Sequence, residues 1–200
     1  MCNLYRMDNS AAEVARLFGV EAPAGSNIGT EVYPGYPGLV FDGEALRSMA
    51  WGFPLARKGA KGQPLKPKPI NNTRTDKLQG GFWRPSFETR RCLIPLNAFA
   101  EAEGPKGSKT RSWFSIPDQP IFTAAGIWRD SAEWGPVYSL VMTDACIEVE
   151  GIHDRMPALI APQDREQWTT GRPNDALALC VPYAGEISVD RTREPWAKRG

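Results

Sequence analysis

Cysteine at position 2 has an unusual chemistry open to it. Removal of Met1 exposes an α-amine and a thiol on adjacent carbons. An unperturbed α-amine has a pKa of about 8, so part of it is neutral at pH 7. A neutral amine condenses with an aldehyde to a Schiff base, and the thiol can then close on the imine carbon to give a five-membered thiazolidine. An internal cysteine cannot form this ring because its nitrogen is an amide. Position 2 alone is also compatible with coincidence.

Two further residues are candidates for proton transfer. His153 is the single histidine of the chain, so any step that uses an imidazole as acid or base depends on it. Glu101 lies in the segment Asn97–Glu103 and offers a carboxylate. A structural histidine and a solvated glutamate are the ordinary interpretations of the two residues taken singly.

The thiols and the histidine do not indicate a metal site. No two of the four cysteines form a CxxC pair, and a zinc site would have to combine scattered cysteines with one histidine. The first seven residues lack the basic-then-apolar pattern of a signal peptide. We therefore expect reduced thiols, no metal, no cofactor and a cytoplasmic protein. The four cysteines are Cys2, Cys92, Cys146 and Cys180.

Positive charge is concentrated between residues 45 and 100. The net charge of the chain is +1, but this segment carries eleven Lys and Arg against two acids, a net +9, and the rest carries −8. Such asymmetry predicts a polyanionic partner. Aromatic side chains are interleaved with the cations, as in proteins that bind single strands, although many of them could belong to the core. These aromatic residues are Trp51, Phe53, Phe82, Trp83 and Phe87.

The elements that must position these residues are mostly strands. Short apolar or alternating runs predict strands at 92–96, 112–116, 121–128, 137–143 and 156–160. Ser10 and Glu13 form a capping-box pattern that opens a helix ending at Gly19, and a second helix is expected over 162–168. Residues 58–69 hold three prolines and four lysines, which predicts an exposed loop.

The composition is that of an ordinary soluble protein, with 42% hydrophobic and 24% charged residues. No stretch approaches the roughly 20 apolar residues of a membrane helix. The fold class that we predict is α+β, a single domain over residues 1–200. Most of it would be antiparallel sheet curled toward a barrel, with a few flanking helices.

Four motifs, in this order and approximate spacing, resemble the SRAP family, the SOS response-associated peptidases or abasic-site processing proteins. The resemblance runs from Cys2 to about residue 162, and a terminal Thr-Arg-Glu-Pro-Trp at 192–196 extends it. The motifs are Met-Cys-Asn at 1–3, Asn-Thr-Arg-Thr-Asp at 72–76, Arg-Cys-Leu-Ile-Pro at 91–95 followed by Phe-Ala-Glu at 99–101, and His-Asp-Arg-Met-Pro at 153–157.

This resemblance implies a protein that binds single-stranded DNA and shields abasic sites in the SOS response. Cys2 would form a thiazolidine with the ring-opened sugar, and Asn72 would orient its amine. Glu101 would assist Schiff-base formation, and His153 would move protons in ring opening and closing. Arg74 would hold a phosphate near the lesion.

Five further residues are expected to contact DNA. Four belong to the basic segment, and Arg155 neighbours His153; the four are Trp51, Lys66, Lys68 and Arg84. We expect a monomer associated with the nucleoid and with no membrane contact.

Two other functions stay open at this point. A cysteine peptidase could use Cys2 as nucleophile, His153 as base and Asn72 as the residue that orients it. A non-covalent single-strand binding module would need the basic segment alone, and its Cys2, Glu101 and His153 would be dispensable.

Overall fold

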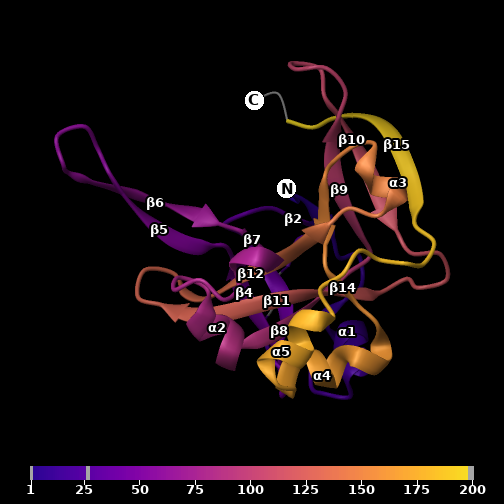
Figure 1. Cartoon of the computed structure of the whole chain (residues 1–200), viewed down its shortest axis with the longest axis horizontal. Coiled ribbons are helices and arrows are strands. Elements are labelled where there is room, and N and C mark those ends of the chain that lie inside the picture. The colour runs from indigo at the N-terminus through magenta and orange to yellow at the C-terminus, as the bar shows by residue number, and fades with distance from the viewer. Residues whose placement is uncertain (1, 26–27, 198–200) are drawn as a thin grey trace.

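Five strands close into a barrel at the centre of the computed structural model, which describes residues 2–25 and 28–197 (Figure 1). Hydrogen bonds connect them in the cyclic order β12, β4, β3, β8, β11 and back to β12, and only the β12–β4 pair is parallel. The predicted fold class, largely antiparallel sheet curled into a barrel with a few helices, is confirmed. The barrel strands are β3 (Pro37–Phe41), β4 (Leu46–Trp51), β8 (Arg91–Leu96), β11 (Phe122–Ser131) and β12 (Gly135–Asp144).

A second sheet of five strands stands beside the barrel, with the order β15–β10–β9–β1–β2. In Figure 1 its long strands rise above the barrel on one side. Three short strands extend the barrel itself: β7 and β13 pair with β12, and β14 pairs with β11. The bounds are β1 (Tyr5–Arg6), β2 (Glu31–Val32), β7 (Asn72–Arg74), β9 (Ala98–Glu103), β10 (Thr110–Ser115), β13 (Arg155–Pro157), β14 (Leu159–Ile160) and β15 (Ser188–Pro195).

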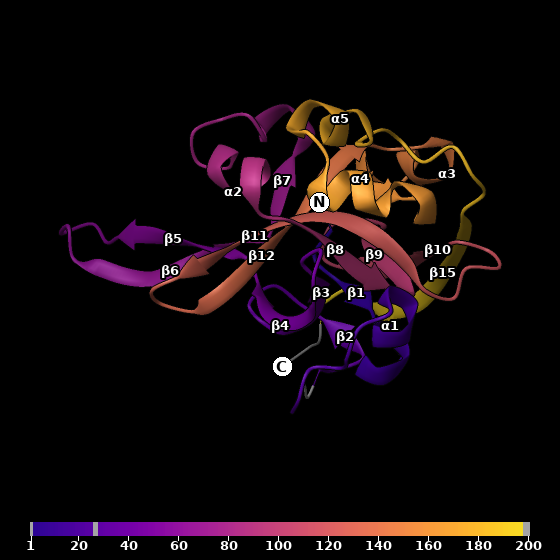
Figure 2. The same cartoon turned by 90° about the horizontal axis from the view of Figure 1, so that it is seen from below.

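The barrel strands are buried on both faces. In β8, Cys92 and Ile94 belong to the main core, while the intervening Leu93 packs in a second cluster with Trp168. Alternate residues of a strand face opposite sides, so two apolar surfaces need two covering layers. Helices cover the outer one, as Figure 2 shows for α4 and α5. The helices are α1 (Ala11–Phe18), α2 (Arg84–Thr89), α3 (Ile147–Glu150), α4 (Arg165–Thr170) and α5 (Pro173–Ala178), with 3-10 turns η1 (Thr75–Lys77) and η2 (Pro162–Asp164).

Both predicted helices are present. The Ser10 side chain accepts a bond from the Glu13 amide, and the Glu13 carboxylate accepts one from the Ser10 amide, so the capping box forms. Gly19 ends α1 with a φ of 67°, in the left-handed region that glycine reaches without a Cβ clash. The predicted second helix begins as η2 and continues as α4.

The prediction of a loop over residues 58–69 is right only for the turn at 59–63 and wrong for the rest. Strands β5 (Phe53–Lys58) and β6 (Pro64–Ile70) pair as an antiparallel hairpin that projects away from the barrel in both views (Figures 1 and 2). Proline removes a backbone donor, but a two-stranded ribbon has two outer edges where that donor is not needed. The prolines that suggested a loop are therefore compatible with this strand.

Within the part of the chain that the structure describes, no helix is both long and apolar enough to cross a membrane.

Candidate active site

Cys2 is fully buried at the start of the chain, next to the second sheet. Its thiol lies 3.4 Å from the carbonyl oxygen of Leu4, and the Leu4 carbonyl also accepts the amide of Ala100 on β9. Burial raises the pKa of the Cys2 thiol, and the negative charge of Glu101 raises it further. The thiol is therefore held in its protonated form.

Two neighbouring asparagines fix the Cys2 backbone. The Asn72 side-chain amide donates a 2.6 Å hydrogen bond to the Cys2 carbonyl oxygen, and Asn71 donates a second at 3.0 Å. Asn72 opens β7, which pairs in parallel with β12 and places Asn72 opposite Leu140. The barrel thus sets the position of the residues that hold Cys2.

The side-chain oxygen of Asn72, Oδ1, is its second polar atom near Cys2. Its Oδ1 is buried and has no hydrogen-bond partner within residues 2–25 and 28–197. A buried acceptor without a donor costs free energy, so such an atom usually has a function or a missing partner. An amide oxygen beside Cys2 is suited to accept a hydrogen bond from an amine.

Glu101 lies on β9 with only 3% of its surface exposed. Burial disfavours the charged carboxylate and raises the pKa of Glu101 to about 7. A carboxyl group with such a pKa exchanges protons readily near neutrality, which suits general acid and base catalysis. Its charge acts on the Cys2 thiol, so the two residues share one site.

His153 follows α3, and its backbone amide donates to the Val149 carbonyl. The ring Nδ1 lies 3.0 Å from the backbone amide of Arg155, which donates to it, and 3.0 Å from Oδ1 of the Asp154 carboxylate. Burial lowers the pKa of the His153 imidazole and favours its neutral form.

Glu101 and His153 are brought into one electrostatic environment. The charges of Asp154 and Lys109 each act on the pKa of both groups. The structure therefore brings all four predicted catalytic residues, on segments far apart in the sequence, to the same part of the fold. Lys109 was not predicted, because a lysine in a loop between two strands, with Lys106 and Arg111 nearby, gives no specific sequence signal.

The cations expected to contact DNA differ in whether they already have an acidic partner. Arg74 donates two hydrogen bonds to Asp76, Arg84 pairs with Glu88, and Arg155 pairs with Asp144, so each arginine already has an acidic partner. Lys66 and Lys68 are exposed on β6. Among the expected DNA contacts, the two lysines are thus the cations with no acidic partner to displace in the described part of the chain.

Trp51 requires a correction. The sequence indicated a base-stacking residue, but the side chain is fully buried and cannot meet a DNA base. Its ring stacks on Tyr138 at a centroid distance of 6.3 Å, and its indole N–H donates to the Asn71 carbonyl at 2.8 Å. Trp51 therefore holds the Asn71 backbone, a long-range role that the spacing of aromatic residues could not reveal.

The other aromatic residues of the basic segment also divide between core and surface. Phe53 and Phe87 are buried, whereas 41% of Phe82 is exposed beside Phe53 and Trp83. The Arg129 guanidinium lies 4.2 Å from the Phe53 ring centre and 4.6 Å from that of Phe82. Phe82 is thus the one member of the predicted aromatic set that the described structure exposes substantially.

No group of three or more histidine, cysteine or acidic residues within the described ranges is arranged to hold a metal ion. The predicted loss of Met1 concerns a residue outside those that the structure describes.

Comparison with known proteins matches this chain to a family model. The family model described as SOS response associated peptidase (SRAP) matches residues 1–193. The abasic site processing protein YoqW of Bacillus subtilis is 26% identical over 147 residues, which cover 69% of this chain and 64% of YoqW. The abasic site processing protein YobE of the same organism is 25% identical over 150 residues, covering 69% of this chain and 66% of YobE. The match thus spans just under two thirds of these relatives.

Solved structures share the fold. A protein from Bordetella bronchiseptica superposes with a TM-score of 0.80 at 19% identity, covering 96% of this chain and 99% of that chain. A protein from Bacteroides thetaiotaomicron gives a TM-score of 0.77 at 19% identity, covering 95% and 91%.

Proposed function

Because the chain belongs to the SOS response associated peptidase (SRAP) family, we propose that it processes abasic sites in single-stranded DNA through a covalent bond to Cys2. Its role would lie in the SOS response to DNA damage. The relatives named abasic site processing proteins support this substrate.

One observation carries the proposal. Asn72 holds the Cys2 carbonyl through its amide nitrogen and keeps a buried oxygen without a partner in the described chain. Once hydrolysis has removed Met1, the new α-amine of Cys2 lies on the same residue as that carbonyl. The Asn72 oxygen can then accept an N–H of the amine and direct its lone pair toward an incoming aldehyde.

The reaction needs no oxidant. The neutral amine attacks the C1′ aldehyde of the ring-opened sugar, and a C–N bond forms while the carbonyl oxygen becomes a hydroxyl group. Protonation of this hydroxyl by Glu101, whose pKa is about 7, lets it leave as water and gives the Schiff base. The Cys2 sulfur then bonds to the imine carbon, and the thiol proton passes to the nitrogen. In this proposal Glu101 and neutral His153 relay that proton.

The contacts do not favour a peptidase triad. In such a triad the asparagine orients the histidine. Here the Asn72 amide donates to the Cys2 carbonyl, and His153 Nδ1 accepts from the Arg155 backbone. A module that only binds DNA would have no use for a buried carboxyl group with a raised pKa beside the first thiol.

Intact mass spectrometry tests the proposal, with the purified protein alone and after incubation with an abasic single-stranded oligonucleotide. We expect a protein mass without Met1, and an adduct equal to protein plus oligonucleotide minus one water. Active protein that keeps Met1 would overturn the mechanism, because its α-amine would not lie on Cys2.

Cys2→Ala tests the ring closure. This variant should lose the stable adduct, while its new terminal amine still forms a Schiff base that borohydride traps and that slowly cleaves the strand. Cys146→Ala, which removes another thiol with 8% exposure, is the matched control and should form the adduct normally. An undiminished stable adduct in Cys2→Ala would exclude the thiazolidine.

A further inference from the structure

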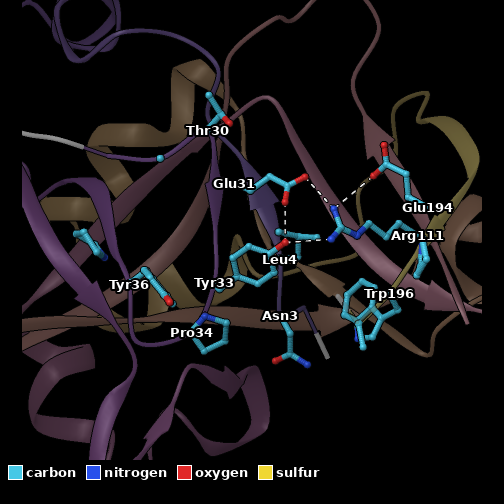
Figure 3. Close-up of a pocket in the computed structure, with 14 residues that line it drawn as sticks. Asn3, Leu4, Thr30, Glu31, Tyr33, Pro34, Tyr36, Arg111, Glu194 and Trp196 are labelled. Carbon is cyan, nitrogen blue, oxygen red and sulfur yellow. Dashed lines mark hydrogen bonds and ion pairs between the residues drawn. The ribbon is translucent and has the colours of Figure 1, made fainter. Parts of the chain in front are cut away.

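A cavity of about 1240 Å³ lies beside the candidate active site (Figure 3). It begins at Asn3, the residue after Cys2, whose side-chain oxygen accepts a 2.9 Å hydrogen bond from Asn71. On β10, Arg111 lines the cavity, while its neighbour Ser112 pairs with Glu101. Successive residues of a strand face opposite sides. The cavity thus occupies the face of the second sheet opposite Glu101 and reaches the active site at Asn3.

The polar part of the cavity is built around a buried arginine. Arg111 is 5% exposed and donates to Glu31 at 2.8 Å, to Glu194 at 3.4 Å and to the Tyr33 hydroxyl at 3.1 Å. Its Nε is buried and has no partner in the ranges that the structure describes. Glu31 also pairs with Arg6 at 3.8 Å, so both guanidinium groups already have carboxylate partners, and the half-exposed Glu194 carboxylate favours a neutral group that donates hydrogen bonds.

The walls of the cavity are aromatic. Tyr33 and Tyr36 lie on the loop between β2 and β3, and Trp196 follows β15 (Figure 3). Tyr36 is 64% exposed, which is unusual for a large side chain with no covering element. Exposed aromatic faces of this kind stack on unpaired nucleobases. The Trp196 end of the cavity also accounts for the terminal motif at 192–196, to which the active site gives no role.

We propose that this cavity binds the unpaired nucleobase next to the abasic nucleotide. The inference rests on the proposed function and deepens it, because an abasic nucleotide has no base of its own to be recognised. Guanine fits best: its N1–H and N2–H are adjacent donors for the Glu194 carboxylate, whose side chain is 54% exposed. Thymine presents carbonyl oxygens on both sides of its single N–H and fits worst.

The experiment measures the rate of adduct formation on single-stranded oligonucleotides that differ only in the base beside the abasic site. Guanine, adenine, cytosine and thymine are placed in turn on the 5′ and the 3′ side, at protein concentrations below saturation. On one of the two sides guanine should react at least about fivefold faster than thymine, the lower limit expected of one well-paired base contact. Tyr36→Ala and Glu194→Ala should each remove most of that ratio. Glu166→Ala, which removes an exposed carboxylate on α4, is the matched control and should preserve it.

Each result is decisive. Rates that do not depend on the neighbouring base on either side, or a ratio that survives in both cavity variants, would overturn the inference while adduct formation itself continues. Absence of adduct with every oligonucleotide would instead refute the proposed function. A peptide or protein segment as the natural occupant would give the first of these outcomes.

Discussion

The Asn72 side chain and the Cys2 carbonyl are joined by a 2.6 Å hydrogen bond across 70 residues of sequence. The bond exists because β7 adds to the barrel beside β12, while the residues after Cys2 add to the second sheet. It is therefore a direct connection between the two sheets at the candidate nucleophile.

Asn72→Ala should slow Schiff-base formation by about tenfold or more, because the variant loses both the carbonyl contact and the oxygen proposed to orient the amine. Asn71→Ala is the matched control. It removes the longer, 3.0 Å bond to the same carbonyl but leaves Asn72 in place, so its effect should be clearly smaller. The measurement is borohydride trapping over time on one abasic oligonucleotide. Equal losses in the two variants would mean that Asn72 has only a structural role.

Glu101→Gln should raise the free energy of unfolding above that of the parent protein, and this gain should be larger at alkaline than at acidic pH. Burial raises the Glu101 pKa to about 7, so this carboxyl group favours folding when protonated, and that contribution is lost as the pH rises through the folded-state pKa. Glutamine cannot ionise and does not lose it. Urea unfolding at about pH 5 and about pH 8 measures the difference.

Glu103→Gln, on the same strand, should change stability with the opposite pH dependence. Hydrogen bonds from Ser112 and Arg191 lower the Glu103 pKa, so its ionised form is the stabilising one and its loss should be felt at neutral rather than acidic pH. If both variants responded to pH alike, the pKa of Glu101 would not be raised.

The adduct-forming rate of Glu101→Gln should also fall by roughly a hundredfold if Glu101 supplies acid or base catalysis.

Replacement of both Lys66 and Lys68 by alanine should weaken binding of single strands and make it less sensitive to salt. Each lost phosphate contact should reduce the slope of log K against log salt by about 0.7. The parent protein should prefer single strands to duplex, because exposed aromatic rings stack only on unpaired bases. Arg16→Ala on α1, on the opposite side of the molecule from the hairpin in Figure 2, is the control and should change neither quantity. An unchanged slope in the double variant would exclude the hairpin from the DNA path.

Trp51→Phe should lower stability by about 1 kcal/mol, because the Asn71 carbonyl loses its buried donor while most of the aromatic packing stays. Adduct formation should slow, because Asn71 would hold the Cys2 carbonyl less firmly. Affinity for intact single strands should not change, since the buried ring does not reach DNA. Thermal unfolding and fluorescence anisotropy separate the two effects. A large loss of affinity in a correctly folded variant would restore the base-stacking interpretation.

Local features of the fold could be predicted from the sequence. The capping box of Ser10 and Glu13 and the stop at Gly19 depend on residues within one or two helical turns, and they appear as expected. Strands such as β8 and β12 are visible as apolar runs because both of their faces are buried. The hairpin of β5 and β6 was missed, because its prolines and lysines suit both a solvated loop and an exposed two-stranded ribbon, and pairing alone separates the two.

Cys2 and its chemistry follow from the sequence by itself, since a thiol beside a terminal amine depends only on position. The identities of Asn72, Glu101 and His153 as candidates also come from sequence motifs. Only the tertiary structure decided the environment of each residue. It raises the pKa of Glu101, favours the neutral form of His153, and lets Asn71 and Asn72 both hydrogen-bond to Cys2. Burial and hydrogen bonds between segments far apart in the chain produce these properties, and they exist only once the barrel has closed. Trp51 shows the same limit, because an aromatic residue among cations serves equally well in a groove or in a core until its neighbours are known.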